Sequence, residues 1–194
     1  MNEIIDEIDF NDLLKNLEDL DLQREYAYKE SRQILISFPK LFVLLHEEKY
    51  TEAKKFLRQL EIRIKKLKSE IIPRWQKYLL QVEIEYVEAY AYLSLLQEGR
   101  LPSQKDIGVE VDAYLLGLLD CIGELRRTVY DNINKKNYDK AVLCFNYMKS
   151  ILEKIFPLSY FDNVVPNLRH KVDLARKLIE ETYIDLTRIK ALKF

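Results

Sequence analysis

Two pairs of acidic residues are the part of this sequence best placed to do chemistry. Glu85 and Glu88 are three residues apart, and Asp120 and Glu124 are four residues apart. Either spacing places both carboxylates of a pair on one face of an α-helix, so that they can reach a common point. Carboxylate oxygens suit Mg²⁺ and Mn²⁺. A metal ion held by four of them would position a phosphodiester and activate a water for its hydrolysis.

Acidic pairs at helical spacing also occur on ordinary solvated helix faces, so spacing alone leaves a second interpretation open. The surroundings of Glu85 and Glu88 favour a buried helix. The segment from Pro73 to Gln97 is apolar over most of its circumference. At about 100° per residue, its polar residues form one narrow stripe: Arg74, Tyr78, Gln81, Glu85, Glu88 and Tyr92.

Asp120 and Glu124 interrupt the apolar stretch from Tyr114 to Leu125. Ala113 and Gly117 lie on the same helical face as these acids, and Gly123 lies within the same segment. Glycine inside a helix costs about 1 kcal/mol relative to alanine. Two glycines at such positions therefore indicate close approach by another backbone or by a ligand.

Other kinds of site find little support. The two histidines, His46 and His170, lie in distant segments, and neither has a cysteine or a second histidine at zinc-ligand spacing. No glycine-rich loop is present to surround a nucleotide phosphate. A metal site in this chain must therefore be built from carboxylates.

The elements that must position the acids are helices. Only 4 glycines and 5 prolines occur in 194 residues, and no period-two strand pattern appears. We expect one all-α domain over residues 1–194. The predicted helical segments cover residues 11–48 with a break near Pro39, 50–72, 73–97, 103–135 with Ser103 as N-cap and Asp106 at its third position, 138–156, and the chain after Pro166.

Composition limits the location and the partners of the protein. The net charge is −1, so any nucleic acid must be bound by local basic patches. The N-terminus is acidic (Glu3, Asp6, Glu7, Asp9) and unlike a signal peptide, and no apolar run reaches membrane-spanning length. Cys121 and Cys144 fit buried free thiols. We expect a cytoplasmic protein with no membrane association.

Two motifs around the acids resemble those of a known family. Residues 85–89, Glu-Tyr-Val-Glu-Ala, look like a motif of translin-associated factor X (TRAX), and residues 112–125 are similar to the Tyr-Leu-Leu-Gly…Asp-x-x-Gly-Glu-Leu signature of the translin family. The segment from Pro166 to Arg176 resembles the last helix of that family, and the stretches 29–32 and 44–46 also fit. The likeness covers nearly the whole chain.

The resemblance implies a translin-like bundle of about seven helices that assembles as an octamer and binds single-stranded RNA, and also DNA. It further implies that TRAX-like subunits are metal-dependent endoribonucleases, whose catalytic and metal-binding acids match Glu85, Glu88, Asp120 and Glu124. With its short loop from Gly99 to Ser103, the chain resembles a compact archaeal-type member, and the resemblance implies a homo-oligomer, with the homo-octamer as the expected state. The implied cofactor is Mg²⁺ or Mn²⁺, and the implied products carry a 5′-phosphate.

The basic, histidine-containing segment that contacts RNA in eukaryotic translin is reduced here to residues 73–78, with only two basic side chains. We therefore consider four candidates for phosphate contacts: Arg74, Lys77, Arg126 and Arg127. Each also fits a salt bridge or a solvated charge. Two other functions stay open: a non-catalytic RNA- and DNA-binding oligomer of the translin type, and a helical scaffold that binds no nucleic acid.

Overall fold

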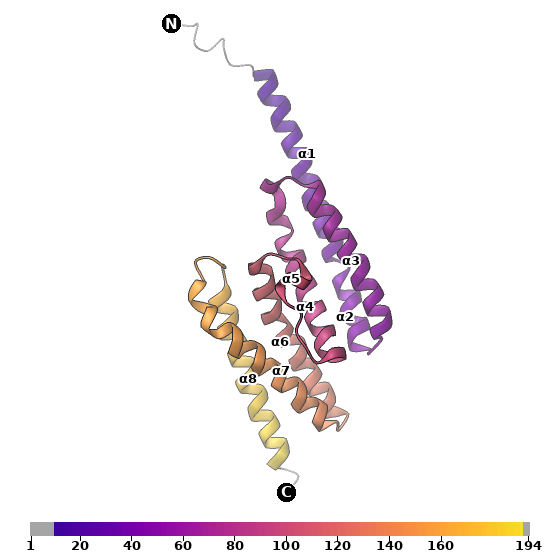
Figure 1. Ribbon diagram of the computed structural model, residues 1–194, viewed down its shortest axis with the longest axis vertical. Helices are drawn as coiled ribbons and strands as arrows, with labels where there is room; N and C mark the ends of the chain where they lie inside the picture. The colour runs from indigo at the N-terminus through magenta and orange to yellow at the C-terminus, as the bar shows by residue number, and fades with distance from the viewer. Residues whose placement is uncertain (1–9, 192–194) are drawn as a thin grey trace.

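The computed structural model describes residues 10–191, with the side chains of 190 and 191 excepted; the acidic residues Glu3, Asp6, Glu7 and Asp9 lie outside this range. Residues 10–191 contain helices and no strand (Figure 1). In chain order the elements are α1 (Phe10–Leu35), α2 (Phe38–His46), α3 (Tyr50–Glu70), the 3₁₀ helix η1 (Pro73–Tyr78), α4 (Leu80–Glu98), α5 (Gln104–Ile107), α6 (Val111–Asn134), α7 (Tyr138–Ile155), the 3₁₀ helix η2 (Phe156–Phe161) and α8 (Leu168–Ala191). Because α5 is a single turn, the expectation of about seven helices is confirmed.

Prolines divide the chain more sharply than the sequence pattern suggested. The first predicted helix breaks after Leu35, because the ring of Pro39 excludes the carbonyl group four residues before it. The prediction of one α-helix over residues 73–97 was wrong. Ile72, held in extended conformation before Pro73, is followed by the 3₁₀ turn η1, and α4 begins only at Leu80. Arg74 and Tyr78 therefore do not belong to the polar stripe of α4.

The segment predicted from Ser103 to Lys135 contains two helices. Ser103 and Asp106 form the capping box of α5, with each side chain bonded to the other residue's backbone N–H, as predicted. Gly108 then ends α5 in the left-handed conformation, at φ 74°, before α6 begins. α7 ends at Ile155, one residue earlier than predicted, and Pro157 lies in the first turn of η2.

α4 and α6 are the centre of the molecule. They pack on each other, and α6 also packs on α7 and α8, while α3 and α2 cover α4 (Figure 1). Twelve of the 19 residues of α4 are buried, including Tyr92, which is 1% exposed. Cys121 of α6 and Cys144 of α7 are free, buried thiols. Polar side chains on α4 and α6 therefore lie next to the core, where their charges interact strongly.

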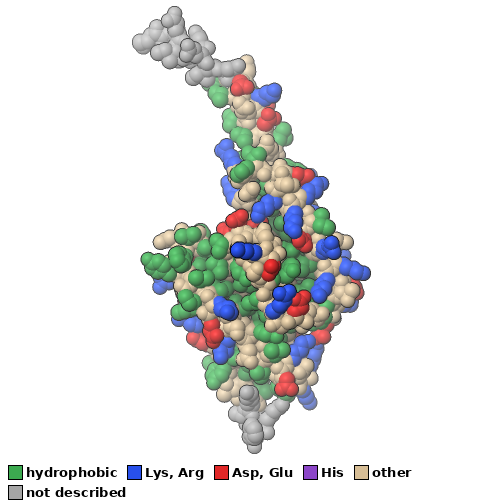
Figure 2. Space-filling view, viewed as in Figure 1, with side chains coloured by type: hydrophobic (Ala, Val, Ile, Leu, Met, Phe, Trp, Pro, Cys, Tyr) green, Lys and Arg blue, Asp and Glu red, His purple; other side chains and the backbone are tan. Residues whose placement is uncertain are grey.

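The N-terminal half of α1 projects beyond the rest of the bundle (Figure 1). It exposes a row of large apolar side chains: Phe10, Leu13, Leu14, Leu17 and Leu22. A second exposed apolar patch, at η2 and the turn after it, forms the protruding green region in Figure 2: Phe156, Leu158, Tyr160, Phe161 and Val164. Within residues 10–191, no helix is both long enough and apolar enough to span a lipid bilayer.

Candidate functional site

Gly117 brings the two acid-bearing helices together. A Cβ atom at this position would lie 2.6 Å from the backbone oxygen of Ile84 and 2.7 Å from Cβ of Val87. Only glycine allows α6 to approach the backbone of α4 this closely. On α4, the contacted residues come directly before Glu85 and Glu88. On α6, Gly117 comes shortly before Asp120 and Glu124. The prediction of a close approach at Gly117 is therefore confirmed.

The four predicted acids line one pocket of about 330 Å³. Two come from α4 and two from α6, and α8 forms the opposite wall. The other lining residues are Leu119, Gly123, Lys171, Leu174, Ala175 and Leu178. Gly123 faces open space, since nothing lies within 4 Å of a Cβ placed there. A larger pocket of about 510 Å³ lies between α3 and α4, but none of the four acids lines it.

Burial and mutual repulsion favour the protonated form of two of these acids. The Glu88 side chain is buried beside Glu85, Asp120 and Glu124, which raises the pKa of Glu88 to about 9. Burial also raises the pKa of Glu85, with smaller contributions from Asp120 and Glu124, although a hydrogen bond from Gln81 opposes the shift. The pocket thus concentrates negative charge in a poorly solvated place, where a cation would relieve the repulsion.

Lys171 of α8 was not predicted as a site residue, yet it is the cation within this pocket. Its ammonium group donates hydrogen bonds to both carboxylate oxygens of Asp120. The two side chains are about one-quarter to one-third exposed. Among the described residues that line the pocket, one lysine faces four carboxyl groups, of which Glu88 keeps its proton at neutral pH. Lys171 comes 51 positions after Asp120, so no local spacing could have linked the two residues.

His46 of α2 contacts the site from its inner side. Its Nε2 atom lies 2.9 Å from Oε2 of Glu124, and its Nδ1 atom lies 3.5 Å from the hydroxyl of Tyr92. Thr128 donates its hydroxyl proton to the backbone oxygen of Glu124, so the Tyr92 hydroxyl donates to Thr128, at 2.6 Å. These contacts place His46 beside the Glu124 carboxylate and Thr128 beside the Glu124 backbone oxygen. Tyr92 belongs to the core, as its burial shows.

The donor set fits a hard divalent cation in its chemistry but only partly in its arrangement. Carboxylates that repel one another beside a pocket are what Mg²⁺ or Mn²⁺ would bind. However, no three His, Cys, Asp or Glu side chains between residues 10 and 191 are grouped closely enough to hold a metal ion. Binding by all four acids therefore requires side-chain rotation, and Lys171 must release Asp120.

The four predicted phosphate contacts lie outside this pocket. Arg74 and Lys77 are exposed on η1 and lie over the ring of Trp75, at 5.1 and 5.4 Å. Arg126 donates to Glu181 of α8 at 2.8 Å and lies over Tyr130, whereas Arg127 is exposed. Arg126 is therefore held in a salt bridge, and the other three cations face solvent.

The protein is an all-helical bundle, and its two central helices place four acids in one pocket. This is the class of protein that the translin resemblance implied. The Translin family model matches residues 22–182. The chain belongs to the Translin family.

Individual relatives agree with this assignment. The chain is 33% identical over 189 residues to the uncharacterized protein MJ0175 of Methanocaldococcus jannaschii, covering 95% of this chain and 85% of that protein. Among solved structures, it is similar to AfC3PO, with 29% identity and a TM-score of 0.84, and to AfC3PO in complex with duplex RNA, with 28% identity and a TM-score of 0.86; each match covers 95% of this chain and 98% of the other. Apo-NeC3PO, at 22% identity and a TM-score of 0.71 over 92% of this chain and 96% of that one, has the same fold.

Proposed function

We propose that this protein is the catalytic subunit of a divalent-metal-dependent endoribonuclease that hydrolyses phosphodiester bonds of RNA. The observation that carries the proposal is the convergence of Glu85, Glu88, Asp120 and Glu124 on one pocket. The similarity to AfC3PO, which was solved with duplex RNA, supports RNA as the ligand. The resemblance to TRAX-like subunits supports cleavage of single strands, so both forms of RNA belong in the test.

The four acids would hold Mg²⁺ or Mn²⁺, which supplies charge neutralisation at the phosphate and lowers the pKa of a water molecule. Glu88, whose pKa is about 9, holds a proton at neutral pH while no cation is bound. It can accept a proton from the attacking water only after losing its own. His46 lies beside the Glu124 carboxylate, and Lys171 donates hydrogen bonds to Asp120.

We also propose that the protein acts as a homo-oligomer, with the octamer as the expected state. The two exposed apolar patches, on the N-terminal half of α1 and at η2, support this, because such surfaces are usually covered in an assembly. Light scattering should give a mass several times that of the 23.2 kDa chain. A mass near that of one chain would contradict the proposal.

A cleavage assay tests the enzymatic proposal. Labelled single-stranded and duplex RNA are incubated with the protein in Mg²⁺, in Mn²⁺ and in chelator. We expect internal cleavage that chelator abolishes. Replacing Glu85→Gln or Asp120→Asn should lower the rate at least about 100-fold, because each removes a negative ligand from the metal. Glu98→Gln serves as a control, because Glu98 is an exposed acid at the end of α4, outside the pocket.

Cleavage that continues unchanged in the Glu85 and Asp120 variants, or in chelator, would contradict the proposal. One observation favours the alternative, a non-catalytic RNA- and DNA-binding protein: Lys171 already occupies Asp120, and the acids are not grouped as metal ligands in residues 10–191. A retarded band with RNA at low and moderate salt, without cleavage in Mg²⁺ or Mn²⁺, would favour that alternative. No band shift at either salt would favour a scaffold.

A further inference from the structure

The position of Lys171 in the acid pocket indicates a functional role for this side chain. Of the residues between 10 and 191 that line the acid pocket, it is the one basic residue, and it comes from a different helix from the acids. Its neighbours on the α8 wall are apolar: Leu174, Ala175 and Leu178. The ammonium group therefore bonds across the pocket, to Asp120 of α6. The Lys171 side chain remains 25% exposed.

The charge of the pocket explains why a lysine lies there. Four carboxyl groups share a small space, where burial and, to a smaller extent, mutual repulsion raise the pKa of Glu85 and of Glu88; the charge of Lys171 partly offsets this shift. Its two hydrogen bonds engage both oxygens of Asp120, so a second cation that approached this carboxylate would be repelled by the ammonium charge. The ammonium thus stands where a divalent ion would contact Asp120.

We propose that Lys171 is the resident counter-ion of the acid pocket, that it competes with divalent cations for Asp120, and that it binds a phosphate of the nucleic acid after leaving Asp120. The inference rests on the proposed function. A lysine suits both tasks, because its ammonium group is a compact charge on a flexible four-carbon stem. A phosphodiester that enters a pocket lined by acids is repelled by them, and Lys171, the basic residue among the described lining residues, would add a positive contact to that of the metal ion.

The two tasks predict effects of opposite sign for Lys171→Gln. Without the competing ammonium, Mn²⁺ should bind about tenfold more tightly, measured by calorimetry or electron paramagnetic resonance in the absence of RNA. Because glutamine offers the phosphate no positive charge, single-turnover cleavage at saturating Mn²⁺ should slow by about 10-fold or more. A residue that only supported the fold would weaken both metal binding and cleavage when removed.

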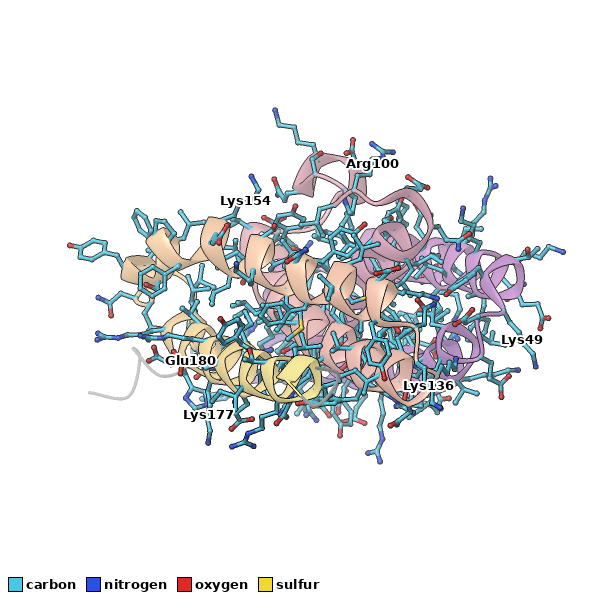
Figure 3. The ribbon with its side chains drawn as sticks, turned by 90° about the horizontal axis from the view of Figure 1, so that it is seen from below. Lys49, Arg100, Lys136, Lys154, Lys177 and Glu180 are labelled. Atoms are coloured by element: carbon cyan, nitrogen blue, oxygen red, sulfur yellow. The ribbon has the colours of Figure 1, made fainter. Side chains whose placement is uncertain are left out.

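Two further variants define the result. Lys171→Arg keeps the charge and should retain weak, wild-type-like Mn²⁺ binding. Lys177→Gln removes a charge from the same helix, but Lys177 is exposed and points away from the bundle (Figure 3), so it should change neither property. If Lys171→Gln is poorly folded by circular dichroism, Lys171→Met preserves the length of the stem and takes its place.

Unchanged or weaker Mn²⁺ binding in Lys171→Gln would overturn the competition, and tighter binding with unimpaired cleavage would overturn the phosphate contact. These failures differ from failure of the proposed function. In that case the wild-type protein neither binds Mn²⁺ nor cleaves RNA, and the Lys171 proposal is refuted with it.

Discussion

Glu88 offers a quantitative test of the pocket that does not depend on activity. Its carboxyl group has a pKa of about 9 in the folded protein, against an ordinary value of 4.5. The folded state therefore keeps a proton that the unfolded chain releases above pH 4.5. Glu88 contributes stability that is fully present below pH 4.5 and is lost progressively as the pH rises to about 9.

The size of the effect follows from the shift in pKa. Each pH unit in this window costs about 1.4 kcal/mol of the free energy of unfolding, so the interval from pH 5.5 to 8.5 costs about 4 kcal/mol. Glu88→Gln has nearly the same shape and does not titrate, so it should lack this loss. We expect the variant to gain about 4 kcal/mol relative to the wild-type protein as the pH rises from 5.5 to 8.5.

Urea denaturation at pH 5.5, 7.0 and 8.5, in chelator and at fixed protein concentration, measures this difference. Taking the difference between the two proteins cancels the contributions of titratable groups that do not interact with Glu88. Glu180→Gln is the control, because Glu180 is an exposed acid of α8, and its difference from wild type should stay nearly constant with pH. If Glu88→Gln and the wild-type protein give parallel curves, the argument that the acids repel one another in a buried pocket fails.

Three further predictions concern the site, two of them its packing and the third its metal binding. Gly117→Ala should destabilise the fold by about 3 kcal/mol, because the new Cβ would meet the backbone of α4 at 2.6 Å. Gly123→Ala should instead stabilise the fold by about 0.5–1 kcal/mol through helix propensity. Urea denaturation compares the two variants, and equal effects would contradict the packing described. Tyr92→Phe should cost about 1 kcal/mol by the same measurement, because it removes the donor to Thr128 without opening a cavity, and an unchanged midpoint would show that this bond contributes nothing. Glu88 must lose its proton to bind a cation, so Mn²⁺ binding at pH 7 should release about one proton per ion. Isothermal titration in buffers of different ionisation enthalpy measures this release. No release would contradict a metal ligand at Glu88.

The sequence predicted those parts of the site that depend on local helix geometry. The pairs Glu85–Glu88 and Asp120–Glu124 face one pocket because their spacing fixes a common helix face, and Gly117 indicated the close contact between α4 and α6. Gly123 is also a glycine inside α6, but it faces open space. The sequence did not distinguish the two, because helix propensity is the same for a packed glycine and for one beside a pocket.

Lys171 and His46 could not be found in the same way. Each reaches the acids from a helix far along the chain, and only the packing of α8 and of α2 brings it there. The break of the third predicted helix at η1 was missed for a related reason. Apolar periodicity continues through Pro73–Tyr78, although these residues form a 3₁₀ turn and α4 begins only at Leu80. The family resemblance predicted the four acids as site residues, but it did not predict which side chains contact them.

The most direct test of the central claim is a crystal structure grown with Mn²⁺ and measured for anomalous scattering. Our account predicts an anomalous peak in the pocket between α4, α6 and α8, within coordination distance of carboxylates from both acidic pairs, with Lys171 moved away from Asp120. A protein that cleaves RNA in Mn²⁺ but shows no peak there, or binds the ion elsewhere, would contradict the account.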